Sequence, residues 1–220
     1  MESLAQMTEN NRNFDNDAAS WEDNPTRVRL AEQIVVAITD QIVLSSDMDV
    51  MDFGCGTGLI SRRILPFVRT VVGVDSSPGM LEVFRKKAAA EGLGGIGCRL
   101  VDIDKGEALA GRYDAVVSGM TMHHIHDLKP LLMQFYSVLS PGGYLCIADL
   151  DPDGGEFHAD STGVYHNGFE RASLRQTFID AGFDDVSQAT AAEVTKPSRG
   201  GAMQRFTIAL TVGIKSRAGE

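Results

Sequence analysis

Several features that mark other classes of protein are missing from this sequence. Only three of its 220 residues are cysteines, and Cys55, Cys98 and Cys146 lack the C-x-x-C spacing of a zinc or redox motif. We therefore expect free thiols in a reducing compartment. No run approaches the roughly 18 to 20 apolar residues of a membrane helix, and the first residues carry no apolar secretion segment. These absences predict a cytoplasmic protein with no membrane partner.

Positive charge is also scarce. The chain has 20 Lys and Arg against 30 Asp and Glu, a net charge of −10 at pH 7. A protein whose main partner is DNA or RNA needs a basic surface for the phosphates. The densest basic run, Arg85 to Lys87, is short and typical of a solvated helix face. We expect no nucleic-acid partner.

The chain is long enough for one sizeable core, since 43% of its 220 residues are hydrophobic. Residues 1–24 are polar and predict an N-terminal arm, disordered in its first ten residues or serving as a lid. Asn24 and Pro25 form a cap and first-turn pair that predicts a helix from about Thr26 to Leu44. We expect one domain over residues 25–216.

Beyond Asp49 the hydrophobic pattern alternates between strand and helix, which is typical of a parallel sheet covered by helices. Ser77 and Asp127 are predicted to begin two of these helices. In residues 206–214 large apolar residues alternate with small or polar ones, which predicts a strand with one bulkier face. The stretch 151–169 has no regular pattern, and irregular segments of that length are often functional.

The most informative motif is VMDFGCGTG, residues 50–58. A short apolar strand leads into three glycines, where backbone N–H groups can approach a ligand without Cβ obstruction. A dinucleotide fingerprint needs a glycine at position 59, which is Leu59, and no Lys-Ser or Lys-Thr pair closes a phosphate-binding loop. Asp52, at the end of the strand, suits a cation such as an amino-acid ammonium.

Further motifs follow at the ends of later strands. Asp75 ends the strand after the glycine turn, one βαβ unit further along. Taken in order, the segments resemble the class I S-adenosylmethionine-dependent methyltransferases between about residues 10 and 215. The segments that carry this resemblance are VMDFGCGTG, VVGVDSSPGML, LVDID, YDAVVSGMTMHHIHD and LSPGGYLCIADLD.

The resemblance implies an α/β fold, Rossmann-like, with a seven-stranded sheet in the order 3-2-1-4-5-7-6, strand 7 antiparallel, and helices on both faces. It implies S-adenosyl-L-methionine as methyl donor and S-adenosyl-L-homocysteine as product. In this family the glycine turn passes the methionine part, the acidic residue matching Asp75 holds the ribose, and those matching Asp102 and Ile103 contact adenine. The positions it marks as cofactor-binding are Asp52, Gly54, Cys55, Gly56, Gly58, Asp75, Ser76, Met80, Asp102, Ile103, Ser118 and Trp21.

Three histidines, His123, His124 and His126, follow the fourth predicted strand, at the sheet edge where open α/β folds place ligands. A histidine can take a proton at neutral pH, so His123 and His124 are the candidate catalytic residues. We favour His123 as the side chain that faces the methyl group. For His124 a structural role and a functional role stay equally open. Trp21 likewise suits either a lid or a simple anchor of the arm.

The long irregular stretch contains two more histidines, His158 and His166, among several acidic residues. Imidazoles and carboxylates are suitable ligands for zinc, iron or manganese. Their spacing matches no named metal motif, so we predict no metal and favour a loop that recognises the methyl acceptor.

The sequence thus predicts a methyltransferase that acts on a small-molecule acceptor, as a monomer or homodimer. Whether oxygen, nitrogen or carbon is methylated stays open. Two alternatives remain: a cofactor-binding regulatory subunit without activity, and a nicotinamide-dependent oxidoreductase, which Leu59 disfavours.

Overall fold

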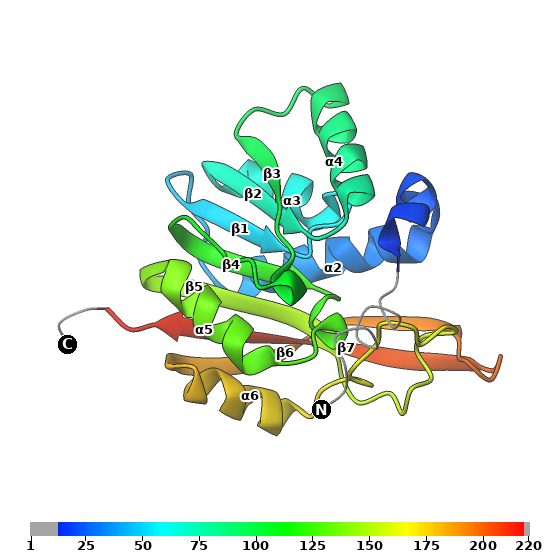
Figure 1. Ribbon diagram of the computed structural model, residues 1–220. Helices are drawn as coiled ribbons and strands as arrows, with labels where there is room; N and C mark the ends of the chain where they lie inside the picture. Colours follow the sequence, from blue (N-terminus) through cyan, green and yellow to red (C-terminus); the bar gives the residue numbers. More distant parts are fainter. Residues whose placement is uncertain (1–12, 218–220) are drawn as a thin grey trace.

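A seven-stranded sheet forms the centre of the molecule in the computed structural model, which describes residues 13–217 (Figure 1). The strands lie in the order β3-β2-β1-β4-β5-β7-β6, which confirms the predicted topology. All neighbouring pairs are parallel except those of β7, which runs antiparallel to β5 and β6. The strands are β1 (Asp49–Phe53), β2 (Thr70–Asp75), β3 (Ile96–Leu100), β4 (Tyr113–Gly119), β5 (Leu139–Leu150), β6 (Phe183–Pro197) and β7 (Met203–Lys215).

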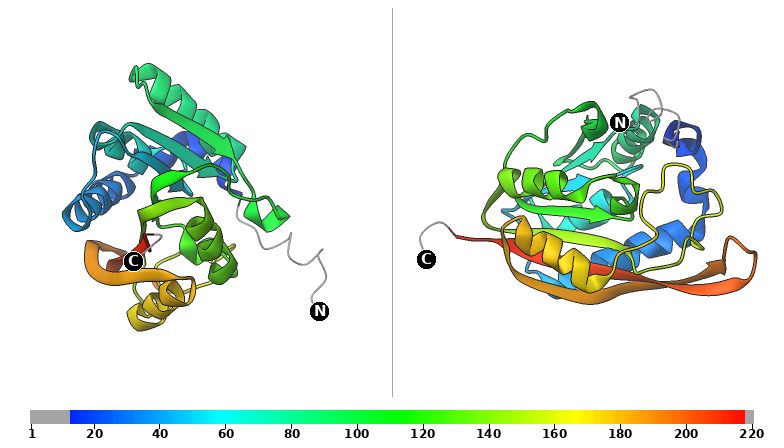
Figure 2. Two further views of the ribbon diagram at one scale, coloured as in Figure 1. Left: turned by 90° about the vertical axis from the view of Figure 1, so that its left-hand side faces the viewer. Right: turned by 60° about the horizontal axis from the view of Figure 1, so that its bottom comes forward.

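Helices cover both faces of the sheet (Figures 1 and 2). Residues of α2 and α3 pack into one hydrophobic core, and residues of α5 and α6 into a second core on the opposite face. The α-helices are α2 (Pro25–Gln41), α3 (Leu59–Ile64), α4 (Pro78–Ala90), α5 (Leu128–Val138) and α6 (Arg171–Asp180). Short 3-10 helices are η1 (Phe14–Asn16), η2 (Ala18–Asp23), η3 (Leu65–Phe67), η4 (Ile103–Lys105) and η5 (Met122–His124).

Three helices begin at the predicted capping residues. The side chains of Asn24, Ser77 and Asp127 each accept a backbone N–H from the first turn of α2, α4 and α5, at 2.9, 3.1 and 3.1 Å. Each cap satisfies a donor that the helix itself leaves unpaired. The predicted end of the first helix at Leu44 was wrong, because Ile42 already adopts an extended conformation with φ of −129°.

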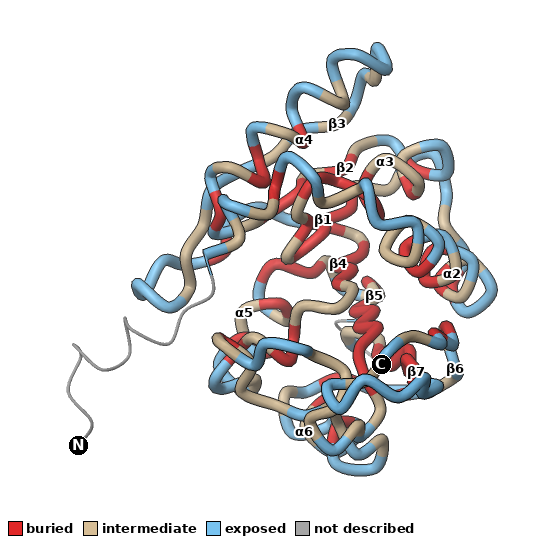
Figure 3. The backbone as a smooth tube through the Cα atoms, turned by 90° about the vertical axis from the view of Figure 1, so that its right-hand side faces the viewer, coloured by how far each residue is buried: buried red, intermediate tan, exposed pale blue. Residues whose placement is uncertain are grey.

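The central strands are buried on both faces, whereas the outer strands β3 and β6 are partly exposed (Figure 3). In β7, Ala209 and Thr211 are as buried as the larger Ile208 and Leu210. The prediction of one bulkier face therefore missed that both faces of this strand are covered.

Residues 151–169 contain neither helix nor strand, as predicted. They lie beside the far part of the β6–β7 hairpin, which extends past the other strands (Figures 1 and 2). The N–H of Arg199, in the hairpin turn, donates to the carbonyl of Glu156 at 2.9 Å. Hairpin and loop therefore support each other.

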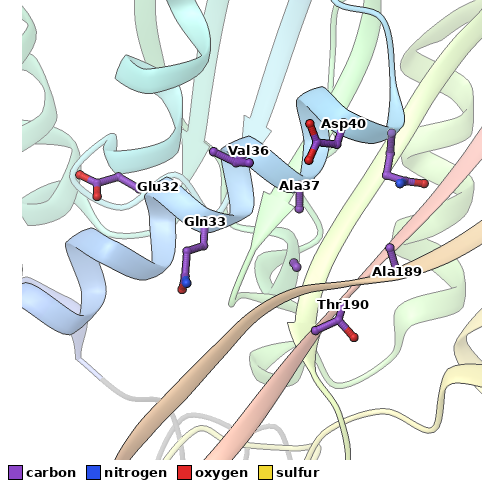
Figure 4. A pocket seen from close by; sticks show the side chains of 9 residues that line it. Glu32, Gln33, Val36, Ala37, Asp40, Ala189 and Thr190 are labelled. Atoms are coloured by element: carbon purple, nitrogen blue, oxygen red, sulfur yellow. The ribbon is translucent and has the colours of Figure 1, made fainter.

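A groove of about 400 Å³ lies between α2 and β6 (Figure 4). Exposed Val36 lies along it, together with Glu32 and Asp40 from the same helix. None of the predicted site residues lines this groove. The groove is therefore separate from the strand ends that carry the predicted site. Within residues 13–217 no helix combines the length and apolarity needed to cross a bilayer.

Candidate functional site

The glycine turn between β1 and α3 has the backbone that its sequence predicts. Gly54, Gly56 and Gly58 all have positive φ, at 71°, 53° and 84°. A Cβ on Gly58 would lie 1.9 Å from the ring of Phe84, and one on Gly54 would lie 2.2 Å from Oγ1 of Thr121. These two glycines are therefore required by packing as well as by conformation.

Gly56 differs from its neighbours because space is open beside it. Among residues 13–217, apart from the two chain neighbours of Gly56, the one atom within 4 Å of a Cβ built there is the Met80 sulfur, at 3.9 Å. Met80 itself is buried beneath the turn, with an exposed fraction of 2%. Gly56 is thus the glycine at which the backbone can approach a ligand.

Asp75, at the end of β2, is tied directly to this turn. Its Oδ2 accepts the N–H of Gly56 at 2.8 Å, and its Oδ1 accepts the N–H of Ser77 at 2.9 Å. Burial raises the pKa of Asp75, and these backbone donors only partly oppose the shift. Ser76 is exposed next to it. The turn and the second acidic residue are therefore one preassembled unit.

Asp52 lies below the turn with an exposed fraction of 1%. Ser61 Oγ donates to its Oδ2 at 2.5 Å, while Oδ1 has no hydrogen-bond partner within the described part of the chain. Burial raises the pKa of Asp52 to about 7, with a smaller contribution from the charge of Asp75. A buried carboxylate oxygen without a partner fits a bound ammonium group, which would stabilise its charged form.

The raised pKa makes a prediction for the Asp52→Asn variant. Because the folded state binds the proton of Asp52 more tightly than the unfolded state, the protonated carboxyl contributes to stability, fully so below pH 3.8, its ordinary pKa. This contribution is lost as the pH rises through about 7, the pKa in the folded state. The uncharged amide avoids the loss, so we expect the free energy of unfolding at pH 8 to increase by about 2 kcal/mol, with little change at pH 4. Urea denaturation at both pH values measures this. The exposed Asp40→Asn is the control, and an unchanged or lower stability of Asp52→Asn at pH 8 would contradict the prediction.

Asp102 and Ile103 follow β3, on the far side of Asp75. The carbonyl of Asp75 accepts the N–H of Val101 at 3.0 Å, which brings this segment to the same edge. The Asp102 carboxylate accepts the N–H of Asp104 at 3.2 Å and pairs with Lys105 at 2.8 Å. Ile103 is partly buried against the second core. Asp102 therefore shapes this turn, and its contact with adenine stays a prediction.

Two predicted cofactor residues lie in the interior instead. Ser118 Oγ donates to the carbonyl of Phe53 at 2.8 Å and joins β4 to β1. The sulfur of Cys55 is 2.7 Å from the position that a Cβ on Gly73 would take, so it fills the space that this glycine leaves. The described residues show a packing role for both side chains, and their predicted cofactor contacts stay untested.

His123, in η5 after β4, is buried with an exposed fraction of 1%. Its Nδ1 is 2.7 Å from Oδ1 of Asp149, near the end of β5. Because Nδ1 faces a carboxylate, it carries the proton, and Nε2 is left to accept one. The other oxygen of Asp149 accepts the N–H of Met122 at 2.8 Å. Burial raises the pKa of Asp149, but His123, the N–H of Leu150 and His124 together outweigh this and lower it overall.

The sequence interpretation did not include Asp149. The signal was present, since this aspartate ends a buried strand at the same sheet edge as Asp52 and Asp75. Its pairing with His123 depends on β4 and β5 being neighbours, with Gly119 opposite Ala148.

His124 is partly buried beside this pair. Its Nδ1 is 2.6 Å from the carbonyl of Gly163, and its ring contacts Phe14 edge-on with centroids 5.2 Å apart. The ring centroids of His123 and His124 are 4.2 Å apart. His124 therefore links the long loop and the N-terminal arm to the strand end, which supports its structural role and leaves its functional one open.

The described part of the N-terminal arm packs against the glycine turn and α4. Asp15 Oδ1 accepts the hydroxyl of Ser77 at 2.5 Å and the N–H of Gly79 at 2.7 Å. Trp21 is partly buried in the first core, and the Arg27 guanidinium stacks on it at 3.8 Å. The first ten residues, predicted to be disordered, lie outside the described part of the chain.

Glu22 is the strongest attachment of the arm. Its carboxylate accepts the hydroxyl of Thr57 at 2.6 Å and pairs with Arg62 at 2.8 Å and Lys87 at 2.6 Å. Burial raises the pKa of Glu22, but these three partners together outweigh it and the net shift is downward. The arm is thus bonded both to the glycine turn and to α4.

The long loop, residues 151–169, brings His158 next to His123 and His124, and these three side chains form a histidine cluster. The ring centroid of His158 is 4.8 Å from that of His123. The N–H of His166 donates to the carbonyl of His123 at 3.2 Å, but its ring is directed to Ile125, with Nε2 2.8 Å from the carbonyl of that residue. Among residues 13–217 no three His, Cys, Asp or Glu side chains are arranged to hold a metal ion.

Comparison with known proteins shows which proteins this chain resembles. Residues 50–143 match the family model described as methyltransferase domain. An uncharacterized methyltransferase of Schizosaccharomyces pombe is 34% identical over 156 residues, which cover 64% of this chain and 55% of the relative. A ubiquinone biosynthesis O-methyltransferase of Coxiella burnetii is 28% identical over 128 residues, 58% of this chain and 51% of that protein. The chain spans about half the length of the curated relatives it matches.

Among solved structures, the fold matches phosphoethanolamine N-methyltransferase 2 of Haemonchus contortus in complex with phosphomonomethylethanolamine and S-adenosylhomocysteine. The TM-score is 0.69 at 17% identity, with 93% of this chain and 60% of that chain covered. At this identity the likeness concerns the fold alone. The sheet order, the strand ends that carry the motifs and the match over residues 50–143 all agree with a methyltransferase domain, and over that part of its length the chain is similar to methyltransferases.

Proposed function

We propose that this protein transfers a methyl group from S-adenosylmethionine to a hydroxyl group of a small molecule. The observation that carries the proposal is the sheet edge itself. There the Gly56–Asp75 unit, at the ends of β1 and β2, stands beside the His123–Asp149 pair, at the ends of β4 and β5. The Gly56–Asp75 unit suits the methyl donor, and the His123–Asp149 pair suits a base that takes a proton from the acceptor.

The donor half fits S-adenosylmethionine on three points. The turn is open beside Gly56, Asp75 presents a fixed carboxylate for ribose hydroxyls, and Asp52 has an unpartnered buried oxygen for the ammonium group. When bound, the cofactor supplies an electrophilic methyl group on a sulfonium. The N-terminal arm, bonded through Glu22 and Asp15 to the turn and to α4, would keep water from this side.

The acceptor half supplies a base. A hydroxyl oxygen becomes a good nucleophile only as its proton leaves, and Nε2 of His123 is the nitrogen that can take that proton. Asp149 fixes the tautomer and stabilises the imidazolium that forms, because its carboxylate is already bonded to Nδ1 at 2.7 Å. An acceptor that loses no proton would gain nothing from this pair, so we favour one that does, and a hydroxyl in the first place.

A small acceptor is favoured over a nucleic acid by the net charge of −10. The state of assembly, monomer or homodimer, and the cytoplasmic location remain predictions.

Two measurements test the proposal. Calorimetry should show binding of S-adenosylhomocysteine, and transfer of a labelled methyl group should favour oxygen acceptors in a panel of oxygen, nitrogen and carbon compounds. Absence of binding under conditions where a known relative binds would contradict the donor assignment. Binding without transfer to any compound would indicate a silent regulatory subunit. Saturable binding of reduced nicotinamide cofactor, followed by fluorescence, would favour an oxidoreductase instead.

A further inference from the structure

His158 has an unsatisfied nitrogen within the histidine cluster. Its Nε2 is buried and finds no hydrogen-bond partner among residues 13–217. Its ring lies between those of His123, at 4.8 Å, and Phe157, at 4.9 Å, with His124 at 5.7 Å. An unpaired buried polar atom is unfavourable, so such atoms commonly mark a place that a ligand completes.

The position of His158 is held from outside by the β6–β7 hairpin. Lys196 Nζ stacks on the ring of Phe157 at 3.7 Å and donates a hydrogen bond to the carbonyl of the same residue. Phe206 contacts that ring edge-on, with centroids 5.1 Å apart. With its neighbour fixed on both sides, His158 stays beside His123 although its Nε2 has no hydrogen-bond partner among the described residues.

Burial and the charges around His158 keep it neutral. Burial, with smaller contributions from His123, His124 and Lys196, lowers its pKa to about 3 against an opposing effect of Asp153. Asp153 is itself occupied, since its oxygens accept the N–H groups of Gly155 and Phe157. The surroundings therefore disfavour a positive charge at this point, although the chain as a whole is acidic.

We propose that His158 Nε2 is a hydrogen-bonding contact for the methyl acceptor, and that the acceptor is a phenol rather than an amine. This inference rests on the proposed function and narrows its substrate class. An ammonium group would meet the imidazoles of His123 and His158 and the ammonium of Lys196, which lies 3.7 Å from the ring centroid of the neighbouring Phe157. The negative charge that develops on a hydroxyl oxygen as its proton passes to His123 is instead stabilised there.

Two further points favour a phenol over an aliphatic alcohol. A phenol has a pKa near 10, whereas the hydroxyl of water, taken here for that of an aliphatic alcohol, has a pKa near 15.7. The pKa of a histidine base is therefore far better matched to that of a phenol. The cluster is also rich in flat rings, with Phe14, Phe157 and three imidazoles in mutual contact. Ring faces and edges of this kind suit an aromatic acceptor.

The probe is 4-nitrophenol, whose absorbance changes on ionisation, titrated into the full chain with S-adenosylhomocysteine present. We expect saturable binding, and an increase of about tenfold in Kd for His158→Leu, which removes one hydrogen bond. His158→Gln keeps a polar end and should restore most of the affinity. His166→Leu is the matched control, because that histidine is in the same loop but bonded to Ile125, and its Kd should equal that of the wild type.

Competition in the wild-type protein provides a test that needs no variant to fold. Phenol should displace 4-nitrophenol at far lower concentrations than benzylamine. Equal displacement by the amine, an unchanged Kd in folded His158→Leu, or no 4-nitrophenol binding alongside normal S-adenosylhomocysteine binding would each overturn the inference. Loss of S-adenosylhomocysteine binding in the wild type would instead contradict the proposed function.

Discussion

The Asp149→Asn variant should lose kcat by roughly 100- to 10,000-fold, the range that a positioned base contributes. The carboxylate bonds Nδ1 of His123 at 2.7 Å and thereby leaves Nε2 free to take the acceptor's proton. An amide in its place can offer an N–H to the imidazole and hold the wrong tautomer. Steady-state methyl transfer to the best oxygen acceptor from the panel measures the loss, which should appear in kcat more than in KM.

Asp151→Asn is the matched control for this variant. Asp151 lies two positions further along, but its carboxylate pairs with Arg171 at 2.6 Å, away from the histidine cluster. It should keep the wild-type kcat. Because Asp149 also accepts the N–H of Met122, thermal unfolding of both variants is needed to show that they are folded. A folded Asp149→Asn protein with normal kcat would exclude the His123–Asp149 pair as the base.

The Asp75→Ala variant should bind S-adenosylhomocysteine at least about 100-fold more weakly, because hydrogen bonds to a charged group contribute more than neutral ones. The substitution removes the proposed acceptor of the ribose hydroxyls. It also frees the N–H of Gly56, which Asp75 holds at 2.8 Å, so the turn loses one of its bonds to β2, while the N–H groups of Gly54 and Cys55 stay bonded to the carbonyl of Val74. Calorimetry measures the change in Kd.

Two companion variants separate ligand contact from local structure. Asp75→Asn keeps one oxygen for the Gly56 or Ser77 N–H and should bind better than Asp75→Ala. Asp49→Ala removes an aspartate at the opposite end of β1, where it pairs with Arg69, and should leave the Kd unchanged. Near-normal binding by Asp75→Ala would refute the assignment of the ribose site.

Most of the fold was predictable because local signals agree with the tertiary structure. Helix starts at Asn24, Ser77 and Asp127 depend on a side chain and the next few N–H groups, which the sequence alone specifies. The glycine turn was predictable for the same reason, since positive φ at Gly54 and Gly58 restricts the residue type. The strand order came from family resemblance and not from spacing.

What was missed depends on contacts between segments far apart in the sequence. Asp149 and His123 are separated by 26 positions, and only the pairing of β4 with β5 brings them together. His158 comes from an irregular loop whose path is set by the hairpin, so no periodicity could place it beside His123. Burial also depends on contacts between distant segments. Thr211 in β7 is a polar residue of a type that is usually exposed, but it is fully buried because helices lie over both faces of the sheet.

The position of β7 has a consequence for synthesis on the ribosome. This strand lies between β5 and β6 in space, although it follows both in sequence. Until residues 203–215 emerge, one edge of β5 has no hydrogen-bond partner and β6 cannot join the sheet. An unpaired apolar strand edge is prone to association with other chains. The nascent protein must therefore protect the β5 edge throughout translation of the loop, α6 and β6.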